Sequence, residues 1–238
     1  MKCQGKYERE AREQGFHAIA GVDEVGRGAL FGPVFAAAVI LSPDRPIRGL
    51  KDSKQLDPDR RTVLAERIRE RAVAWAVAAA DAFEIDRVNI YQASRLAMRR
   101  AVERLNPAPD FLLVDAITID LPVSQRALIH GDALSQCIAA ASILAKVERD
   151  ACMCEWDRVF PEYGLKNHKG YSTPEHWRAL EAHGPTTVHR FSFWPVREHS
   201  PQTLWTGYPR QAELFPAEPE PEESFPDEPL MEMAVCNR

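Results

Sequence analysis

The sequence contains no run of about eighteen consecutive apolar residues, so we expect no membrane-spanning helix. Its first residues are mostly polar or charged and lack the apolar centre of a secretory signal. The five cysteines are an odd number, and none of their spacings matches a zinc-binding pair. Together these absences predict a protein of a reducing, cytoplasmic compartment.

Neither of the common nucleotide-binding motifs is present. The pattern G-x-x-x-x-G-K-[ST] does not occur. Three glycines, Gly26, Gly28 and Gly32, approach the dinucleotide fingerprint, but their spacing is one residue too long. A strand-like apolar run follows them at 33–41, where the fingerprint requires a helix. We therefore expect no nucleotide cofactor.

The formal net charge of −5 is unevenly distributed along the 238 residues. From Pro209 to the end there are two basic and eight acidic residues, whereas the remainder has 28 basic and 27 acidic ones. The nearly neutral body allows nucleic-acid binding through a local basic patch but does not by itself argue for it. The composition predicts a globular domain over 1–200 and a disordered, Pro/Glu-rich acidic tail over 201–238.

Hydrophobic periodicity predicts strands that alternate with helices, which indicates an α/β fold. Early consecutive strands suit a meander, and later strands are expected to be separated by helices. The apolar run at 73–80 fits a strand better than a helix because it is short. The predicted strands cover 17–23, 34–41, 73–80, 111–115 and 126–130. The predicted helices cover 58–71, 84–105, 134–160 and 174–183.

Acidic residues stand at the ends of three predicted strands. They are Asp23, which Glu24 follows directly, Asp115 and Asp132. Neighbouring side chains on a strand point to opposite faces, so Asp23 and Glu24 would share one site only if the strand ended there. Taken singly, each acid is explained as well by a turn or a helix cap. Three acids at strand ends indicate a common site, because such ends meet at one edge of a sheet.

The predicted site contains four carboxylates without accompanying histidine or cysteine, which favours a hard ion such as Mg²⁺ or Mn²⁺. Two such ions about 3.5–4 Å apart commonly activate a water molecule and stabilise the leaving oxygen in phosphodiester cleavage. The residues themselves therefore point to a metal-dependent reaction on a phosphodiester.

Eight stretches, in their order and spacing, resemble the bacterial ribonuclease HII family, the type 2 ribonucleases H. They span about residues 17–198 and lie at 21–28, 51–56, 113–115, 131–132, 138–150, 160–164, 168–173 and 183–184. The resemblance implies a ribonuclease H-like mixed sheet flanked by helices, with a helical C-terminal extension. It also implies a monomeric endonuclease that hydrolyses the RNA strand of RNA–DNA hybrids by two-metal-ion catalysis. Single ribonucleotides in duplex DNA would be incised on their 5′ side, leaving 3′-hydroxyl and 5′-phosphate ends.

The resemblance also assigns roles to individual residues. The metal-binding and catalytic acids would be Asp23, Glu24, Asp115 and Asp132. A loop that senses the ribose 2′-hydroxyl, the group that distinguishes RNA from DNA, would be formed by Gly26, Arg27 and Gly28. Tyr171 would pack on the sugar that follows the ribonucleotide. Phosphate contacts, which position the strand without reading bases, would come from Lys51, Ser53 and Lys54.

Four positions depart from the family pattern. Ala116 stands where glycine is usual, His130 where lysine is usual, Ala29 where proline is common, and Cys137 where serine is expected. None of these changes removes a carboxylate. His130 would make phosphate affinity depend on pH near neutrality.

In the predicted tail, Gln211, Leu214 and Phe215 resemble a short Q-x-x-L-F peptide that binds sliding clamps. Two alternatives to the hybrid nuclease remain. One is a non-catalytic hybrid-binding or clamp-tethered protein, against which the four intact acids argue. The other is a different ribonuclease H-like nuclease such as a junction resolvase, which would not explain Arg27 between its glycines together with Tyr171.

Overall fold

The computed structural model describes residues 5–200. The predicted tail at 201–238, with its clamp-like peptide, lies outside the described residues. The elements in chain order are α1 Lys6–Glu13, β1 Ile19–Val25, β2 Val34–Ile40, η1 Ser53–Gln55, α2 Pro58–Arg71, β3 Ala74–Ala80, α3 Ala82–Glu103, β4 Phe111–Asp115, β5 Ser124–Leu128, α4 Gly131–Leu134, α5 Gln136–Val159, η2 Pro161–Tyr163, α6 Leu165–His168, α7 Pro174–His183 and α8 Trp194–Glu198.

The strands form one mixed sheet in the order β3-β2-β1-β4-β5. The β1–β2 and β2–β3 pairs are antiparallel, which confirms the predicted meander, and β4 joins β1 in parallel after the crossover through α3. The prediction that helices separate the later strands is wrong for β4 and β5. These two strands pair in parallel although only residues 116–123, which contain no helix, link them.

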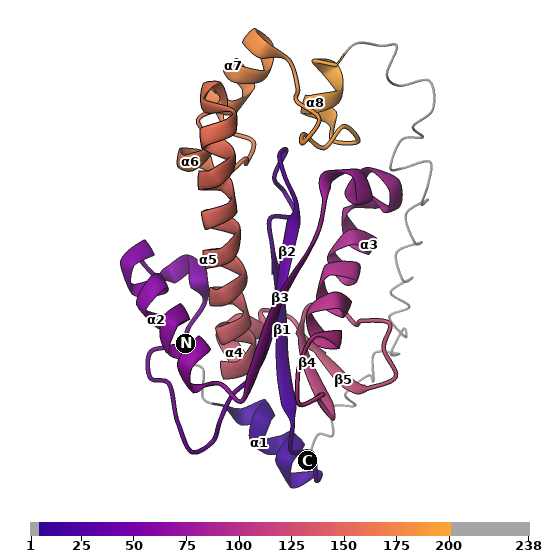
Figure 1. The fold of residues 1–238 in the computed structure, drawn as a ribbon. Coiled ribbons are helices and arrows are strands. Elements are labelled where there is room, and N and C mark those ends of the chain that lie inside the picture. Colours follow the sequence, from indigo (N-terminus) through magenta and orange to yellow (C-terminus); the bar gives the residue numbers. More distant parts are fainter. Residues whose placement is uncertain (1–4, 201–238) are drawn as a thin grey trace, which may run out of the picture. The chain divides into compact units, whose positions relative to one another are not determined.

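Helices cover both faces of the sheet, as Figure 1 shows for α3 on one side and α5 on the other. The alternation of β2 explains both layers. Ala36, Ala38 and Ile40 pack with the buried residues of α3, whereas Ala37 and Val39 pack with α2 and α5. The fold class predicted from the sequence, a mixed sheet flanked by helices with a helical C-terminal extension, is confirmed.

A glycine lets α5 approach the sheet very closely. A Cβ atom at Gly21 in β1 would lie 2.0 Å from the backbone carbon of Cys137 and 2.2 Å from the nitrogen of Ile138. Any side chain there would push the first turn of α5 away from β1. This close approach places the next turns of α5 directly beside the end of β1, where the predicted acids lie.

The helix boundaries follow capping side chains. Asp57 accepts a hydrogen bond from the backbone nitrogen of Arg60 and Pro58 opens α2, while Thr173 caps α7 before Pro174. The helix predicted at 134–160 is α5, Gln136–Val159. Ser135 separates it from α4, because this residue has extended backbone and caps α5 by accepting from the nitrogen of Ile138. The strand predicted at 126–130 lies instead at Ser124–Leu128.

Among residues 5–200, no helix combines the length and the apolar character needed to cross a membrane.

Candidate active site

One cavity of about 390 Å³ collects the four predicted acids. They come from three separate segments: Asp23 and Glu24 from β1, Asp115 from the end of β4, and Asp132 from α4. The other lining residues are Val25, Ser53, Lys54, Ser142, Lys146 and Tyr171. The structure therefore brings together all four acids and three of the seven predicted substrate-binding residues: Ser53, Lys54 and Tyr171.

The geometric reason given for Asp23 and Glu24 from the sequence is wrong. Strand β1 does not end at Asp23, because pairing with β2 continues through Glu24 to Val25. Pairing with β4, in contrast, stops at Val22, so the edge of β1 that faces β4 is unpaired beyond this residue. Both carboxylates line the cavity because it opens along this free edge, where neighbouring side chains on opposite faces remain accessible from one side.

Strand β4 and helix α4 are joined where their acids meet. Asp115 is the last residue of β4, and its Oδ1 accepts a hydrogen bond from the backbone nitrogen of Gly131 at 2.7 Å. This bond brings Asp132, the next residue of α4, toward β4. His130, the residue before α4, has left-handed backbone with φ 57°. This turn separates Asp132 from the end of β5.

Burial and like charge together disfavour ionisation of three of the acids. Burial, followed by the charges of Glu24 and Asp115, raises the pKa of Asp23 well above its usual range. The pKa of Glu24 is raised mainly by burial, although Arg27 opposes this shift. The pKa of Asp132 is raised mainly by burial and then by Asp52 and Asp115. Such a cluster is stabilised by a cation that enters the cavity.

The donor set fits a divalent ion by its chemistry, since four carboxylates supply only oxygen ligands. Within residues 5–200, however, no three His, Cys, Asp or Glu side chains converge closely enough to hold one ion as they stand. Holding an ion would therefore require these side chains to rotate. Asp52, a fifth acid whose charge acts on Asp132, was missed in the sequence reasoning.

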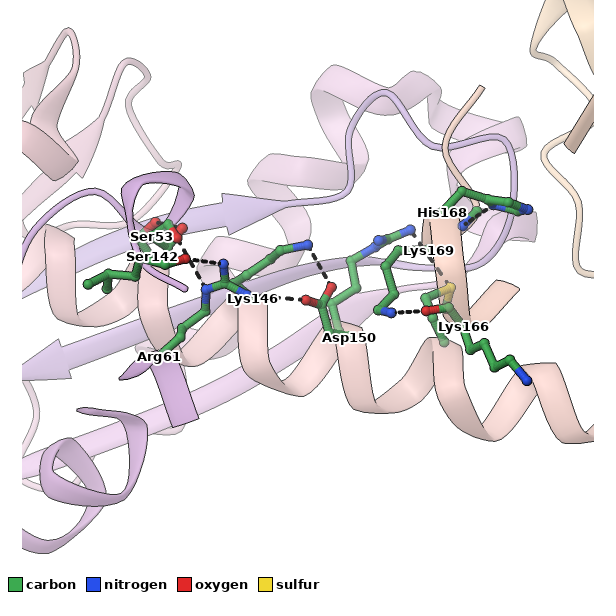
Figure 2. Close-up of polar contacts among 12 residues, drawn as sticks. Ser53, Arg61, Ser142, Lys146, Asp150, Lys166, His168 and Lys169 are labelled. Carbon is green, nitrogen blue, oxygen red and sulfur yellow. Dashed lines mark hydrogen bonds and ion pairs between the residues drawn. The ribbon is translucent and has the colours of Figure 1, made fainter. Parts of the chain in front are cut away.

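Helix α5 supplies two further cavity residues that the sequence reasoning also missed. Ser142 and Lys146 are one turn apart, and Asp150 follows one turn later (Figure 2). The hydroxyls of Ser142 and buried Ser53 are 2.9 Å apart, which ties η1 to α5. Lys146 Nζ donates to Asp150 Oδ1 at 2.6 Å, and burial lowers the pKa of Lys146. The i, i+4 spacing of these residues was the signal for a shared helix face.

Asp150 forms two ion pairs and does not line the cavity. Besides Lys146 it contacts Arg61 of α2, with 3.5 Å between Nη1 and Oδ2 (Figure 2).

The predicted phosphate-binding residues divide into two groups. Ser53 and Lys54 line the cavity, whereas Lys51 does not.

Two buried arginines hold the loop that contains Arg27. Arg190 donates to the carbonyl oxygens of Gly32 and Arg27, each at 2.8 Å, and Arg149 donates to those of Pro33 and Phe31 at 3.4 Å. The Arg149 side chain requires glycine above it, because a Cβ at position 26 would lie 2.2 Å from its Nε. The conformation of this loop is therefore fixed from inside the protein.

The exposed side of the same loop lies beside the cavity. Arg27 Nη1 donates to Glu24 Oε1 at 3.3 Å. Tyr171 forms an isolated bridge with Ala29, and the guanidinium of Arg149 lies 5.1 Å from the centre of its ring. Gly28 has open space where a Cβ would lie and no positive φ. Nothing within the described chain requires glycine at this position.

A ribonuclease HII family model matches residues 20–196. The chain belongs to the ribonuclease HII family. The ribonuclease HII of Solibacter usitatus (strain Ellin6076) is 68% identical over 215 residues, which cover 90% of this chain and 93% of that relative. The enzyme is an endoribonuclease that cleaves the RNA of RNA–DNA hybrids.

Solved structures show the same fold. Ribonuclease H2 from Pyrococcus horikoshii OT3 superposes with a TM-score of 0.66 at 25% identity, covering 76% of this chain and 96% of that chain. Ribonuclease HII of Archaeoglobus fulgidus, solved in a complex with PCNA, gives a TM-score of 0.64 at 29% identity and covers 78% and 98%.

Proposed function

We propose that this ribonuclease HII uses two divalent ions held by Asp23, Glu24, Asp115 and Asp132. The observation that carries the proposal is their position around one cavity, where burial and mutual repulsion raise the pKa of three of them. Bound ions would lower the pKa of the attacking water and neutralise charge on the phosphate oxygens. Whether Mg²⁺ or Mn²⁺ serves better is an outcome of the experiment below.

The basic residues of the cavity support substrate positioning in this proposal. Exposed Lys54 follows Ser53 in η1 and half-buried Lys146 lies on α5, and both line the same cavity as the acids. We assign phosphate contacts to Lys54 and Ser53. Lys51 would contact a phosphate further along the same nucleic-acid strand. Such contacts position the backbone and carry no sequence information.

We further propose that the enzyme incises duplex DNA on the 5′ side of a single ribonucleotide, leaving 3′-hydroxyl and 5′-phosphate ends. Discrimination requires contact with one 2′-hydroxyl. The open space at Gly28 supports this role, because bare backbone there allows a sugar to approach closely. Arg27 beside Glu24 and Tyr171 in the cavity wall complete the surface that would face this sugar.

The test is cleavage of a labelled DNA duplex that carries one ribonucleotide, with Mg²⁺ or Mn²⁺, by the wild type and by Asp23→Asn. We expect a single incision 5′ to the ribonucleotide and a loss of more than about 100-fold in the variant, since an acid that binds an ion directly should matter at least as much as its outer partners. Cleavage restricted to long hybrids would reject the roles of Arg27 and Tyr171. Equal activity of Asp23→Asn would reject the metal assignment.

The tail peptide remains a separate proposal. The Archaeoglobus fulgidus relative was solved as a complex with PCNA, and we propose that Gln211, Leu214 and Phe215 of this chain bind a sliding clamp. A pull-down with the purified clamp should lose the enzyme after Leu214→Ala and Phe215→Ala together. Undiminished capture of that double variant would remove the proposal.

A further inference from the structure

Three histidines of the C-terminal extension pack together behind Tyr171, and we name them the histidine cluster: His168, His176 and His189. His176 and His189 are completely buried. The rings of His168 and His176 stack, with centroids 4.7 Å apart and planes inclined by 15°. Because these rings are packed inside the protein beside the cavity, the position of each ring proton matters for their hydrogen bonds.

The hydrogen-bond partners determine the tautomers. His176 Nδ1 lies 3.0 Å from the carbonyl oxygen of Tyr171, which only accepts, so this nitrogen carries a proton. His189 Nδ1 accepts from the backbone nitrogen of Thr186 at 2.9 Å, so its proton lies on Nε2. The two Nε2 atoms are 3.1 Å apart. His189 therefore donates to His176, which donates to Tyr171, and both rings are neutral.

These hydrogen bonds from His189 to His176 and on to Tyr171 form a relay. It leaves neither histidine with a ring lone pair for a metal ion, because each Nε2 is used by the other ring. Burial lowers the pKa of His176 to about 4 and that of His189 to about 3, which agrees with two neutral rings near neutral pH. His168 has a separate role. Its Nε2 lies 2.8 Å from the carbonyl oxygen of Tyr163, and its Nδ1 accepts from the nitrogen of Gly170 at 3.2 Å.

The backbone of Tyr171 is fixed from two directions. On one side the Tyr171 carbonyl accepts from His176, and on the other Tyr171 forms a bridge with Ala29. The loop at 26–31, which contains Ala29, also contacts the relay through His189. His189 forms a bridge with Phe31, and its ring lies 4.8 Å from the Phe31 ring. Moving the relay would therefore shift Tyr171 relative to the 26–31 loop.

We propose that His176 and His189 are positioning residues that hold Tyr171 at the cavity through this one-directional hydrogen-bond relay. The inference rests on the proposed contact of Tyr171 with substrate. It assigns the specificity-determining geometry of the site partly to two side chains that do not line the cavity. A displacement of about 1 Å in a positioning contact costs up to about 100-fold in rate.

The experiment is a double-mutant cycle on an RNA–DNA hybrid, with kcat and KM measured for each variant. His176→Leu removes the donor to Tyr171, and we expect kcat/KM to fall about 10- to 100-fold. In a Tyr171→Ala background the same change should cost less than about twofold, because the side chain that it positions is absent. His176→Asn, whose amide nitrogen overlies Nδ1, should recover part of the loss.

His183→Gln is the matched control, since it replaces an exposed histidine of the same helix. Thermal unfolding of every variant reports folding, and His189→Phe, which keeps an aromatic ring beside Phe31, tests the relay if His176→Leu does not fold. Fully additive losses would overturn the inference and leave the role of Tyr171 intact. A Tyr171→Ala enzyme with wild-type kinetics would instead reject the substrate contact itself, and the inference with it.

Discussion

The carboxylate cavity and the histidine cluster lie on either side of Tyr171 and solve the problem of buried ionisable groups in opposite ways. The histidines satisfy one another and the neighbouring backbone, and all their ring protons have partners within the chain. The acids repel one another, and burial raises the pKa of Asp23, Glu24 and Asp132. The first arrangement is complete in the folded protein. The second keeps like charges close together, which supports the metal binding that we propose for this site.

The largest effect that separates the two regions is their response to acid. A histidine whose folded pKa lies below its usual 6.5 is protonated first in the unfolded chain, so stability is lost as the pH falls from about 6.5 toward 4 for His176 and 3 for His189. Acids with raised pKa values shift stability in the opposite direction over the lower part of this range. Each histidine should contribute a slope of about 1.4 kcal/mol per pH unit and a loss on the order of 3 kcal/mol in total.

Urea unfolding at several pH values between 7 and 4 measures this contribution. His189→Phe should be less stable at pH 7 but should lose less stability than the wild type on acidification. His183→Gln serves as the control, because its exposed side chain has no such burial. Parallel stability curves for His189→Phe and the wild type would show that the buried rings are not kept neutral by the fold.

A smaller effect compares two buried aspartates under the same substitution. Without divalent ions at pH 7, Asp23→Asn removes a charge from the repelling acids and should stabilise the fold by about 1–3 kcal/mol, which raises Tm by about 2–4 °C per kcal/mol. Asp86→Asn should destabilise it by about 1–3 kcal/mol. Both oxygens of Asp86 accept hydrogen bonds, from Phe191 and Ser192, and an amide nitrogen would face one of these donors.

Calorimetric scans of the two variants and the wild type, each with a chelator, provide the comparison. Opposite signs of the change in Tm would confirm that Asp23 is destabilised by its acidic neighbours whereas Asp86 is satisfied by its hydrogen bonds. A lower Tm for both variants would mean that Asp23 is already compensated within the chain, and the comparison between the two regions would fail.

The sequence predicted much of this site because acids at the ends of apolar strands are a local pattern. It did not predict why Asp23 and Glu24 share a cavity. That depends on β4 pairing with β1 only as far as Val22, and the pairing length of two strands far apart in the chain is not encoded in either strand alone. Ser142 and Lys146 show a similar limit. Their common face is readable from helical spacing, but its direction depends on the packing of α5 against Gly21.

The residues at 116–132 show the same division. Parallel pairing of β4 and β5 without an intervening helix was not expected, and neither was the left-handed backbone at Ala116 and His130. Gln125 stabilises this short link, because its side chain both donates to and accepts from the backbone of Ile119, at 2.8 Å in each case. Such a side-chain bond forms only once the strands are in register.

The sequence by itself determined the α/β class, the capped ends of α2 and α7, the four acids and the likeness to ribonuclease HII. These features follow from hydrophobic periodicity, capping residues and short motifs, which act over a few neighbouring positions. The tertiary structure alone decided which side chains meet in the cavity, which two arginines hold the Arg27 loop, and in which direction the hydrogen bonds of the histidines run. Each of these depends on distances between segments that are remote in the chain, where close packing and the accounting of buried hydrogen bonds select one arrangement.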